Sequence, residues 1–534
     1  MPSAHEATLR LLHGAWRLAA TRETRRFAAA AAALEASQAG RLLHMLRRNA
    51  GTVLGRRHRF ESITSVAEYR RRVPVVGYDE LRDLITRIAA GERDVLTAGG
   101  VRMLERTSGS TAAGKLIPYT NDLRAEFERA ATVWIAGVLR DVPAVRGLRT
   151  YISISPLHAG PRRTEGGIPI GLDDDTGYLS PVARLAARLS LVGSGALGAI
   201  TDPAAWRDAT ARALLEADDL GLISVWSPDF LTLLLDHVAA HWDRLLAGLP
   251  PGRRRVLSRL SAPEPARIWP RLAMVSCWTD AQASAPADQL RARLPGIAIE
   301  PKGLMATEGV VSVPIRRGLA PVLAVTSHVF EFIDLSRPAT PPLLAHELRA
   351  GGDYSPVLTT GGGFHRYHLR DAVRCEGHWH AAPLLRFRGK LDGVADLRGE
   401  KLDPVFATEV VTRALAETAL PYDFALLAPT EPAGIAGYTL FVESPAAESA
   451  IAQLAEHVER LLRDSRHYRL CRDLGQLRPV EAERVHDGRR RRMEVLVDAG
   501  MRLGDIKPAL FDPRPGLAEA LRRGGPSPAD RGPA

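Results

Sequence analysis

Lysine and cysteine are both scarce in this chain. Five of its 71 basic residues are lysine, and its 534 residues include three cysteines, Cys277, Cys375 and Cys471, without paired spacing. This cysteine usage excludes a disulfide-stapled scaffold and favours a reducing compartment. Apolar runs are short: none approaches the roughly 18 residues that a membrane-spanning helix needs, and the start lacks the pattern of a signal peptide. We therefore expect a cytoplasmic protein without a membrane partner.

Acidic residues are fewer than basic ones, which gives a net charge of +10 and a pI near 9.8. Excess positive charge favours an anionic partner, and a small nucleotide satisfies it as well as nucleic acid does. The arginine run at residues 489–492 has no interleaved aromatic residues, which indicates a solvated face rather than a nucleic-acid patch. We expect small-molecule partners, no nucleic acid, and a monomer or a homodimer.

The length exceeds what one hydrophobic core supports, so more than one domain is expected. Apolar runs at residues 151–156 and 222–226 alternate with helical patterns, which predicts an α/β fold with a largely parallel sheet. The pattern of residues 322–334 predicts paired strands as well, and therefore mixed sheets. The boundaries that we predict are 1–391 for a large N-terminal domain, 392–515 for a small α+β C-terminal domain and 516–534 for a disordered tail.

The most informative stretch is a loop of small residues, Thr-Ser-Gly-Ser-Thr-Ala-Ala-Gly-Lys, at residues 107–115. Small residues allow backbone N–H groups and hydroxyls to surround a polyphosphate, and a lysine adds a counter-charge. Arginine does not replace this compact point charge, so a surviving lysine is informative. The residues expected to contact phosphate are Ser108, Gly109, Ser110, Thr111 and Lys115. The other lysines are Lys302, Lys390, Lys401 and Lys507, none clearly on a solvated helix face.

A Walker loop is one alternative for this segment, because residues 109–115 fit the G-x-x-x-x-G-K pattern. However, Leu116 stands where a Ser or Thr holds the metal, and Pro118 disfavours the helix that must follow. The loop therefore predicts a phosphate site outside the Walker class.

Two further patterns are weak. Residues 193–198 fit a dinucleotide fingerprint, but residues 182–191 before them have helical spacing rather than that of a buried strand. Cys375, His378 and His380 are zinc ligands by type, but no fourth ligand has a fitting spacing. We expect neither a dinucleotide site nor a metal site at these positions.

Residues 107–120 resemble the phosphate-binding signature of adenylate-forming enzymes, in particular the Gretchen Hagen (auxin-responsive) acyl-acid amido synthetases in their bacterial form. Further motifs resemble this family in the same order over residues 36–510. They include Tyr69-Arg70, Met305-Ala-Thr-Glu-Gly309, His328-Val-Phe-Glu-Phe332, Phe364-His-Arg-Tyr-His-Leu-Arg-Asp371, residues 387–401 and Gly504-Asp-Ile-Lys-Pro508. The resemblance implies an adenylate-forming N-terminal domain and a mobile C-terminal one.

The resemblance also implies a ligase that uses ATP and Mg²⁺ in two half-reactions. ATP and a carboxylic acid form an acyl adenylate and pyrophosphate, and the amine of an amino acid then displaces AMP to give an amide. An acyl-CoA ligase shares the adenylation motifs, but residues 328–333 resemble the amido synthetases more closely. A nucleotide-binding protein without catalysis is the third interpretation. Residues 152–171, 226–230 and 277–279 offer apolar and aromatic lining for the acid.

The resemblance assigns roles to individual residues. Glu308 supports the Mg²⁺ on ATP, and a carboxylate suits such a hard cation. Thr307 and Tyr367 belong to the nucleotide site. Asp371 accepts hydrogen bonds from both ribose hydroxyls, which match the two oxygens of one carboxylate.

Two roles fall in the C-terminal part, and two residues depart from the family pattern. Lys507 matches a lysine that bridges the substrate carboxylate and the α-phosphate, and Asp392 matches a hinge position. Arg370 stands where relatives carry Gly, and Lys390 stands where they carry Arg. The departure at Arg370 leaves nucleotide binding open to test, and the departure at Lys390 leaves the hinge open to test.

Overall fold

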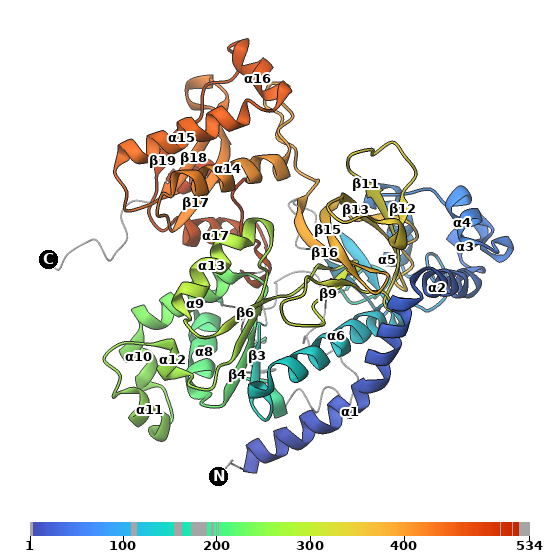
Figure 1. The fold of residues 1–534 in the computed structure, drawn as a ribbon, viewed down its shortest axis with the longest axis horizontal. Helices are drawn as coiled ribbons and strands as arrows, with labels where there is room; N and C mark the ends of the chain where they lie inside the picture. The colour runs from blue at the N-terminus through green and yellow to red at the C-terminus, as the bar shows by residue number, and fades with distance from the viewer. Residues whose placement is uncertain are drawn as a thin grey trace. The chain divides into compact units, whose positions relative to one another are not determined.

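The computed structural model describes residues 4–107, 115–153, 163–171, 189–193, 197–198, 200, 202–501, 503–514 and 516–522. The chain divides into two compact units (Figure 1). The first comprises residues 1–280 and 287–387, and the second comprises residues 281–286 and 388–534.

The helices before residue 300 form because apolar residues recur at helical spacing. In α5 (Tyr78–Ala89), Leu81, Leu84, Ile85 and Ile88 are buried along one face. The others are α1 (Ala4–Ala32), α2 (Leu34–Asn49), α3 (Val53–His58), α4 (Val66–Arg72), α6 (Asn121–Asp141), α8 (Pro203–Glu216), α9 (Pro228–Ala240), α10 (Trp242–Ala247), α11 (Pro251–Leu257), α12 (Pro265–Ile268) and α13 (Ser284–Arg293), with short 3-10 turns at Phe60–Ser62, Pro143–Val145 and Ala281–Ala283.

A four-stranded parallel sheet has the order β3 (Arg149–Ile152), β4 (Leu220–Ser224), β5 (Met274–Cys277) and β6 (Ala298–Pro301). Every residue of β4 and β5 is buried, as expected where helices cover both faces. Leu222 and Met274 pack against α6, and α8 and α9 lie on the other side of the sheet (Figure 1). The parallel strands predicted near residues 151–156 and 222–226 are confirmed.

A larger sheet of eight strands has the order β12-β11-β13-β15-β16-β10-β9, with β14 beside β13. Antiparallel pairs join β9 to β10, β10 to β16, β12 to β11, β11 to β13, and β13 to β14 and β15. The mixed sheets that the sequence predicts are confirmed: here the strands are antiparallel, because the short connections leave no room for crossover helices. The strands are β9 (Ser312–Val313), β10 (Val322–Leu323), β11 (Val329–Asp334), β12 (Leu343–Leu344), β13 (Asp353–Thr359), β14 (Tyr367–His368), β15 (Asp371–Trp379) and β16 (Ala382–Lys390), with a 3-10 turn at Ala345–Glu347.

The second unit contains a three-stranded sheet in the order β17 (Phe424–Thr430), β18 (Gly437–Glu443) and β19 (Glu481–Arg484). Side chains alternate between its faces. Leu427 and Leu440 belong to the core with α14 and α15, whereas Leu426 and Phe441 belong to the cluster with α18. The helices are α14 (Pro404–Thr418), α15 (Glu448–Leu462), α16 (Arg466–Asp473), α17 (Gly488–Asp498) and α18 (Leu517–Arg522), with 3-10 turns at Pro432–Gly434 and Leu503–Asp505.

Two predictions for this unit are wrong. The arginine run at residues 489–492 is not a solvated face, because Arg491 and Arg492 are only 8% and 4% exposed. Disorder was predicted for residues 516–534, yet residues 517–522 form α18 and bury Leu517 and Leu521. Residues 523–534 lie outside the described residues.

No helix among the described residues has both the length and the apolar character needed to cross a membrane.

Candidate functional site

The predicted phosphate loop connects the two strands of a β-hairpin. Strands β1 (Met103–Arg106) and β2 (Leu116–Tyr119) pair with Arg106 opposite Leu116. The backbone N–H of Thr107 donates to the carbonyl of Lys115 at 2.9 Å, so the two ends of the loop are held together. Ser108, Gly109, Ser110 and Thr111 lie outside the described residues.

Lys115 lies beside Tyr78, the first residue of α5. Its Nζ is 5.7 Å from the centre of the Tyr78 ring, and the Tyr78 hydroxyl accepts a hydrogen bond from the backbone N–H of Leu116 at 2.8 Å. Burial raises the pKa of Tyr78, and the negative charge of Glu308 adds to this rise. Tyr78, Lys115 and Glu308 therefore belong to one neighbourhood.

Glu308 lies in the turn between β7 (Met305–Ala306) and β8 (Gly309–Val310). It is 8% exposed, and the Tyr367 hydroxyl donates to its Oε1 at 3.3 Å. Thr307 precedes it in the same turn and is half-buried. The structure thus brings Glu308 and Tyr367, predicted from separate motifs, into contact.

The buried His328 holds the turn that carries Glu308 through a hydrogen bond to its backbone. The backbone N–H of Val310 donates to His328 Nε2 at 2.9 Å, and His328 Nδ1 lies 2.8 Å from an oxygen of Glu126. Because Nε2 accepts a hydrogen bond, we assign the proton to Nδ1. A Cβ on Gly309 would lie 2.7 Å from Nε2, so glycine is required at this position. The sequence did not single out this support, because Glu126 is far from His328 along the chain.

A buried ion pair connects two of the sequence motifs. Arg366 donates to both oxygens of Glu331, at 2.8 and 2.9 Å, and Arg70 lies 3.1 Å from the same carboxylate. Arg366 also donates to the backbone carbonyls of Arg70 and Val73, at 2.9 and 2.7 Å. This cluster holds the segment that carries Tyr367, and neither Arg366 nor Glu331 was among the predicted site residues.

Asp371 begins β15 and is 1% exposed. The residue before it, Arg370, is exposed and has a φ of 58°. This left-handed backbone conformation favours glycine, which fits the glycine that the resemblance to the family leads us to expect at this position. The Arg370 side chain reaches α5: its Nη2 would lie 3.8 Å from a Cβ on Gly77, and it lowers the pKa of Asp79, though less than the Arg82 hydrogen bond does.

Three consecutive segments of the chain match domains of one known protein family. Residues 23–265 match the GH3 family N-terminal domain, residues 321–390 the GH3 family central domain and residues 406–511 the GH3 family C-terminal domain. The chain belongs to the GH3 family. This confirms the resemblance drawn from the motifs.

The chain also resembles individual GH3 proteins. It is 24% identical over 417 residues to the probable indole-3-acetic acid-amido synthetase GH3.12 of Oryza sativa subsp. japonica, covering 65% of this chain and 67% of the relative. The solved structure of the AtGH3.15 acyl acid amido synthetase in complex with 2,4-DB has a TM-score of 0.80 at 19% identity, covering 95% of this chain and 96% of that one. A 2-hydroxyisobutyryl-CoA ligase in the postadenylation state has a TM-score of 0.56 at 14% identity, covering 92% of this chain and 91% of that one. The predicted fold class, that of adenylate-forming enzymes, is confirmed.

In this GH3 protein, Lys507 and Asp392 belong to the second unit. Lys507 follows the 3-10 turn Leu503–Asp505 and is half-buried. Its backbone carbonyl accepts a hydrogen bond from Arg492 at 2.9 Å, and Arg492 also binds Asp512 at 3.1 Å. Asp392 is half-buried just after β16 ends at Lys390. The buried arginine therefore fixes the backbone of the segment that carries Lys507.

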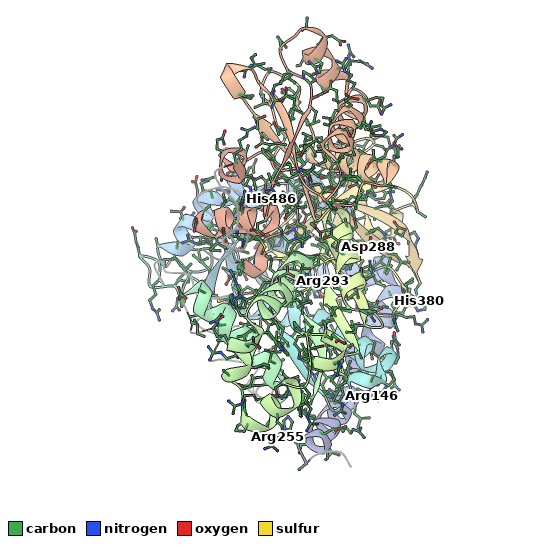
Figure 2. All side chains as sticks on the ribbon, turned by 90° about the vertical axis from the view of Figure 1, so that its left-hand side faces the viewer. Arg146, Arg255, Asp288, Arg293, His380 and His486 are labelled. Carbon is green, nitrogen blue, oxygen red and sulfur yellow. The ribbon has the colours of Figure 1, made fainter. Side chains whose placement is uncertain are left out.

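The described residues of the GH3 chain contain no group of three or more His, Cys, Asp or Glu side chains that could hold a metal ion. Within them, His378 and His380 are exposed while Cys375 is buried (His380 is labelled in Figure 2). A single carboxylate at Glu308 nevertheless suits Mg²⁺, which binds one or two carboxylates together with substrate phosphates. Of the dinucleotide pattern at residues 193–198, residues 194–196 lie outside the described residues.

Proposed function

We propose that this GH3 protein is an ATP-dependent acyl-acid amido synthetase. A carboxylate oxygen attacks the α-phosphorus of ATP, pyrophosphate leaves, and an acyl adenylate forms. The amine of an amino acid then attacks the acyl carbon, AMP leaves with the bonding electrons, and the nitrogen loses a proton to give an amide. The observation that carries the proposal is the meeting of Lys115, Tyr78, Glu308 and Tyr367 beside the phosphate-loop hairpin, in a chain whose relatives are named as amido synthetases.

The residues of the first unit would hold the nucleotide. The loop at residues 108–111 and Lys115 would bind the phosphates, and Asp371 would accept hydrogen bonds from the ribose hydroxyls. Glu308 would bind Mg²⁺, which when present neutralises charge on the phosphates. Tyr367 would orient Glu308 through the hydrogen bond to Oε1.

The second unit would supply a cation and a moving part. We assign Lys507 to the bridge between the substrate carboxylate and the α-phosphate, where negative charge grows in the transition state. Asp392 would be the hinge of a mobile domain, and the adjacent Gly393, with a φ of 87°, tolerates large backbone changes. Cys277, Cys375 and Cys471 are all free thiols, which supports a cytoplasmic enzyme.

The test is ATP–pyrophosphate exchange across a panel of aryl, indole-type and aliphatic acids. We expect exchange with at least one acid and none without acid. Mass spectrometry of reactions with pooled amino acids, and separately with coenzyme A, then identifies the acceptor. An acyl-CoA product without any amide would replace the proposal by an acyl-CoA ligase, and no exchange with any acid would leave a nucleotide-binding protein without catalysis.

A first substitution tests the departure at Arg370. Arg370→Gly removes a side chain from a left-handed backbone position, so we expect the free energy of unfolding to rise by about 0.5–1 kcal/mol. It also removes a positive charge beside Asp371, so we expect KM for ATP to fall. The matched control is Arg59→Gly, because Arg59 is exposed and has a φ of 52° at the end of α3. The control should gain similar stability with an unchanged KM, whereas a KM that rises in Arg370→Gly would mean that Arg370 itself contacts the nucleotide.

A further inference from the structure

Lys302 is a buried cation at the carboxyl end of the parallel sheet. It follows β6 directly and is 9% exposed. Its Nζ donates to Ser224 Oγ at 2.5 Å and lies 5.3 Å and 4.9 Å from the ring centres of Trp134 and Trp226. We call Lys302, Ser224, Ser276, Trp134 and Trp226 the Lys302 cluster. Among the described residues, no carboxylate forms an ion pair with Lys302.

Two other polar groups of the cluster have no hydrogen-bond partner among the described residues. Ser276 lies opposite Ser224 in the paired strands β4 and β5, so both hydroxyls are on the face covered by α6. Within the described part of the chain, the buried Ser276 hydroxyl and the buried Trp134 Nε1–H have no hydrogen-bond partner. Native structures leave few buried polar groups unpaired. The cluster thus offers several donors, and no carboxylate among the described residues pairs with its ammonium group.

A purely structural role does not account for this arrangement. Burial lowers the pKa of Lys302 to about 8, which shows that the surroundings disfavour its charge. The two indole faces offset part of this cost, but an apolar side chain of similar length would avoid it altogether. The indoles of Trp134 and Trp226 are themselves only partly buried, so a flat ligand can lie against them.

The position of the cluster separates it from the adenylation residues. Trp134 and Glu126 are both on α6, eight residues apart, which corresponds to about 12 Å along the helix. Glu126 holds His328, and His328 holds the turn of Glu308. These two positions on α6 are therefore about 12 Å apart along the helix, which leaves room between the groups they face for an aromatic ring with a carboxylate at each end. Ligands of open α/β sheets bind at the carboxyl ends of the strands, where the cluster lies.

We propose that the Lys302 cluster binds an anionic group at the far end of the acid substrate, so that the enzyme prefers aromatic acids that carry a second acidic group. The inference rests on the proposed function, because the acid must also present a carboxylate for adenylation. The ammonium and the hydroxyls bind the distal anion, and the indoles contact the aromatic ring. The cluster is thus a specificity determinant rather than a part of the adenylation chemistry.

The experiment compares acids that differ only by a distal carboxylate: benzoate with terephthalate, and cinnamate with 4-carboxycinnamate. In ATP–pyrophosphate exchange, we expect the wild-type enzyme to show a higher kcat/KM for the diacid of each pair. Lys302→Met should lower the ratio of diacid to monoacid kcat/KM by roughly 10- to 100-fold, the value of a charge-assisted hydrogen bond. Ser276→Ala should lower it by a smaller factor and carries the test if Lys302→Met does not fold. Arg255→Met is the control, because Arg255 is exposed on α11 in the same unit (Figure 2) and should leave the ratio unchanged.

The outcomes separate the inference from the proposed function. Exchange with the monoacids but no preference for the diacids would overturn the inference and keep the proposed function. An equal loss for both members of a pair in Lys302→Met would also overturn it, because Lys302 would then act on the shared carboxylate. A Lys302→Met variant with unchanged exchange and a raised KM for the amino acid would assign the cluster to the acceptor instead. The absence of exchange with every acid would overturn both.

Discussion

Lys507→Ala is expected to reduce acid-dependent pyrophosphate exchange by roughly 100- to 1,000-fold, the usual effect of removing one donor that acts on transition-state charge. We expect the loss in kcat rather than in KM for ATP, because Asp371 and the phosphate loop would still hold the nucleotide. A preformed acyl adenylate should still react with the amino acid, since adenylation alone needs this lysine. The measurement is steady-state exchange, followed by single-turnover aminolysis of the synthetic adenylate.

The control for this substitution is Arg469→Ala in the same unit. Arg469 is exposed on α16, so its loss removes one positive charge without touching the proposed site. Exchange that is unchanged in Lys507→Ala would show that the C-terminal motif was matched wrongly. Exchange that falls equally in both variants would point to the net charge of the unit instead.

Arg492 holds the backbone of the segment that carries Lys507, although the sequence predicted a solvated side chain there. It is 4% exposed and holds the Lys507 carbonyl together with Asp512. The sequence predicted a solvated arginine run here, but consecutive residues of a helix point about 100° apart, so four in a row cannot all face solvent. Arg491 and Arg492 turn inward, and their donors bind backbone carbonyls of Leu521 and Lys507.

In the first unit, short sequence motifs carry the residues that we propose for adenylation. Glu308, Tyr367 and Asp371 each come from a local pattern, and the structure places the Tyr367 hydroxyl on Glu308. The supports behind them were not predicted, because they come from distant parts of the chain. Glu126 of α6 contacts His328, the residue before β11. No local sequence pattern predicts a contact between residues so far apart along the chain.

The buried Glu331–Arg366 pair is another such support, and its removal should have the largest effect on stability. Arg366→Met leaves Glu331 with Arg70 alone and orphans the carbonyls of Arg70 and Val73. Breaking a buried pair from one side costs about 3–5 kcal/mol, because the remaining charge stays buried. We expect a loss of this size in urea unfolding of the first unit. Lysine should not rescue it, since a point charge cannot bind both carboxylate oxygens and two carbonyls.

A double variant decides whether the orphaned charge is the cause. Adding Glu331→Gln to Arg366→Met removes that charge. The double variant should therefore lose roughly 1–3 kcal/mol less unfolding free energy than the sum of the losses in the two single variants. The exposed pair Arg291–Asp288 on α13 is the control, and Arg291→Met should change stability by less than about 0.5 kcal/mol. Since Arg366 fixes the segment of Tyr367, the folded fraction of Arg366→Met should also exchange pyrophosphate more slowly. A loss below about 1 kcal/mol in Arg366→Met, or strict additivity in the double variant, would mean that Arg70 alone neutralises Glu331 and that the motif is held by packing.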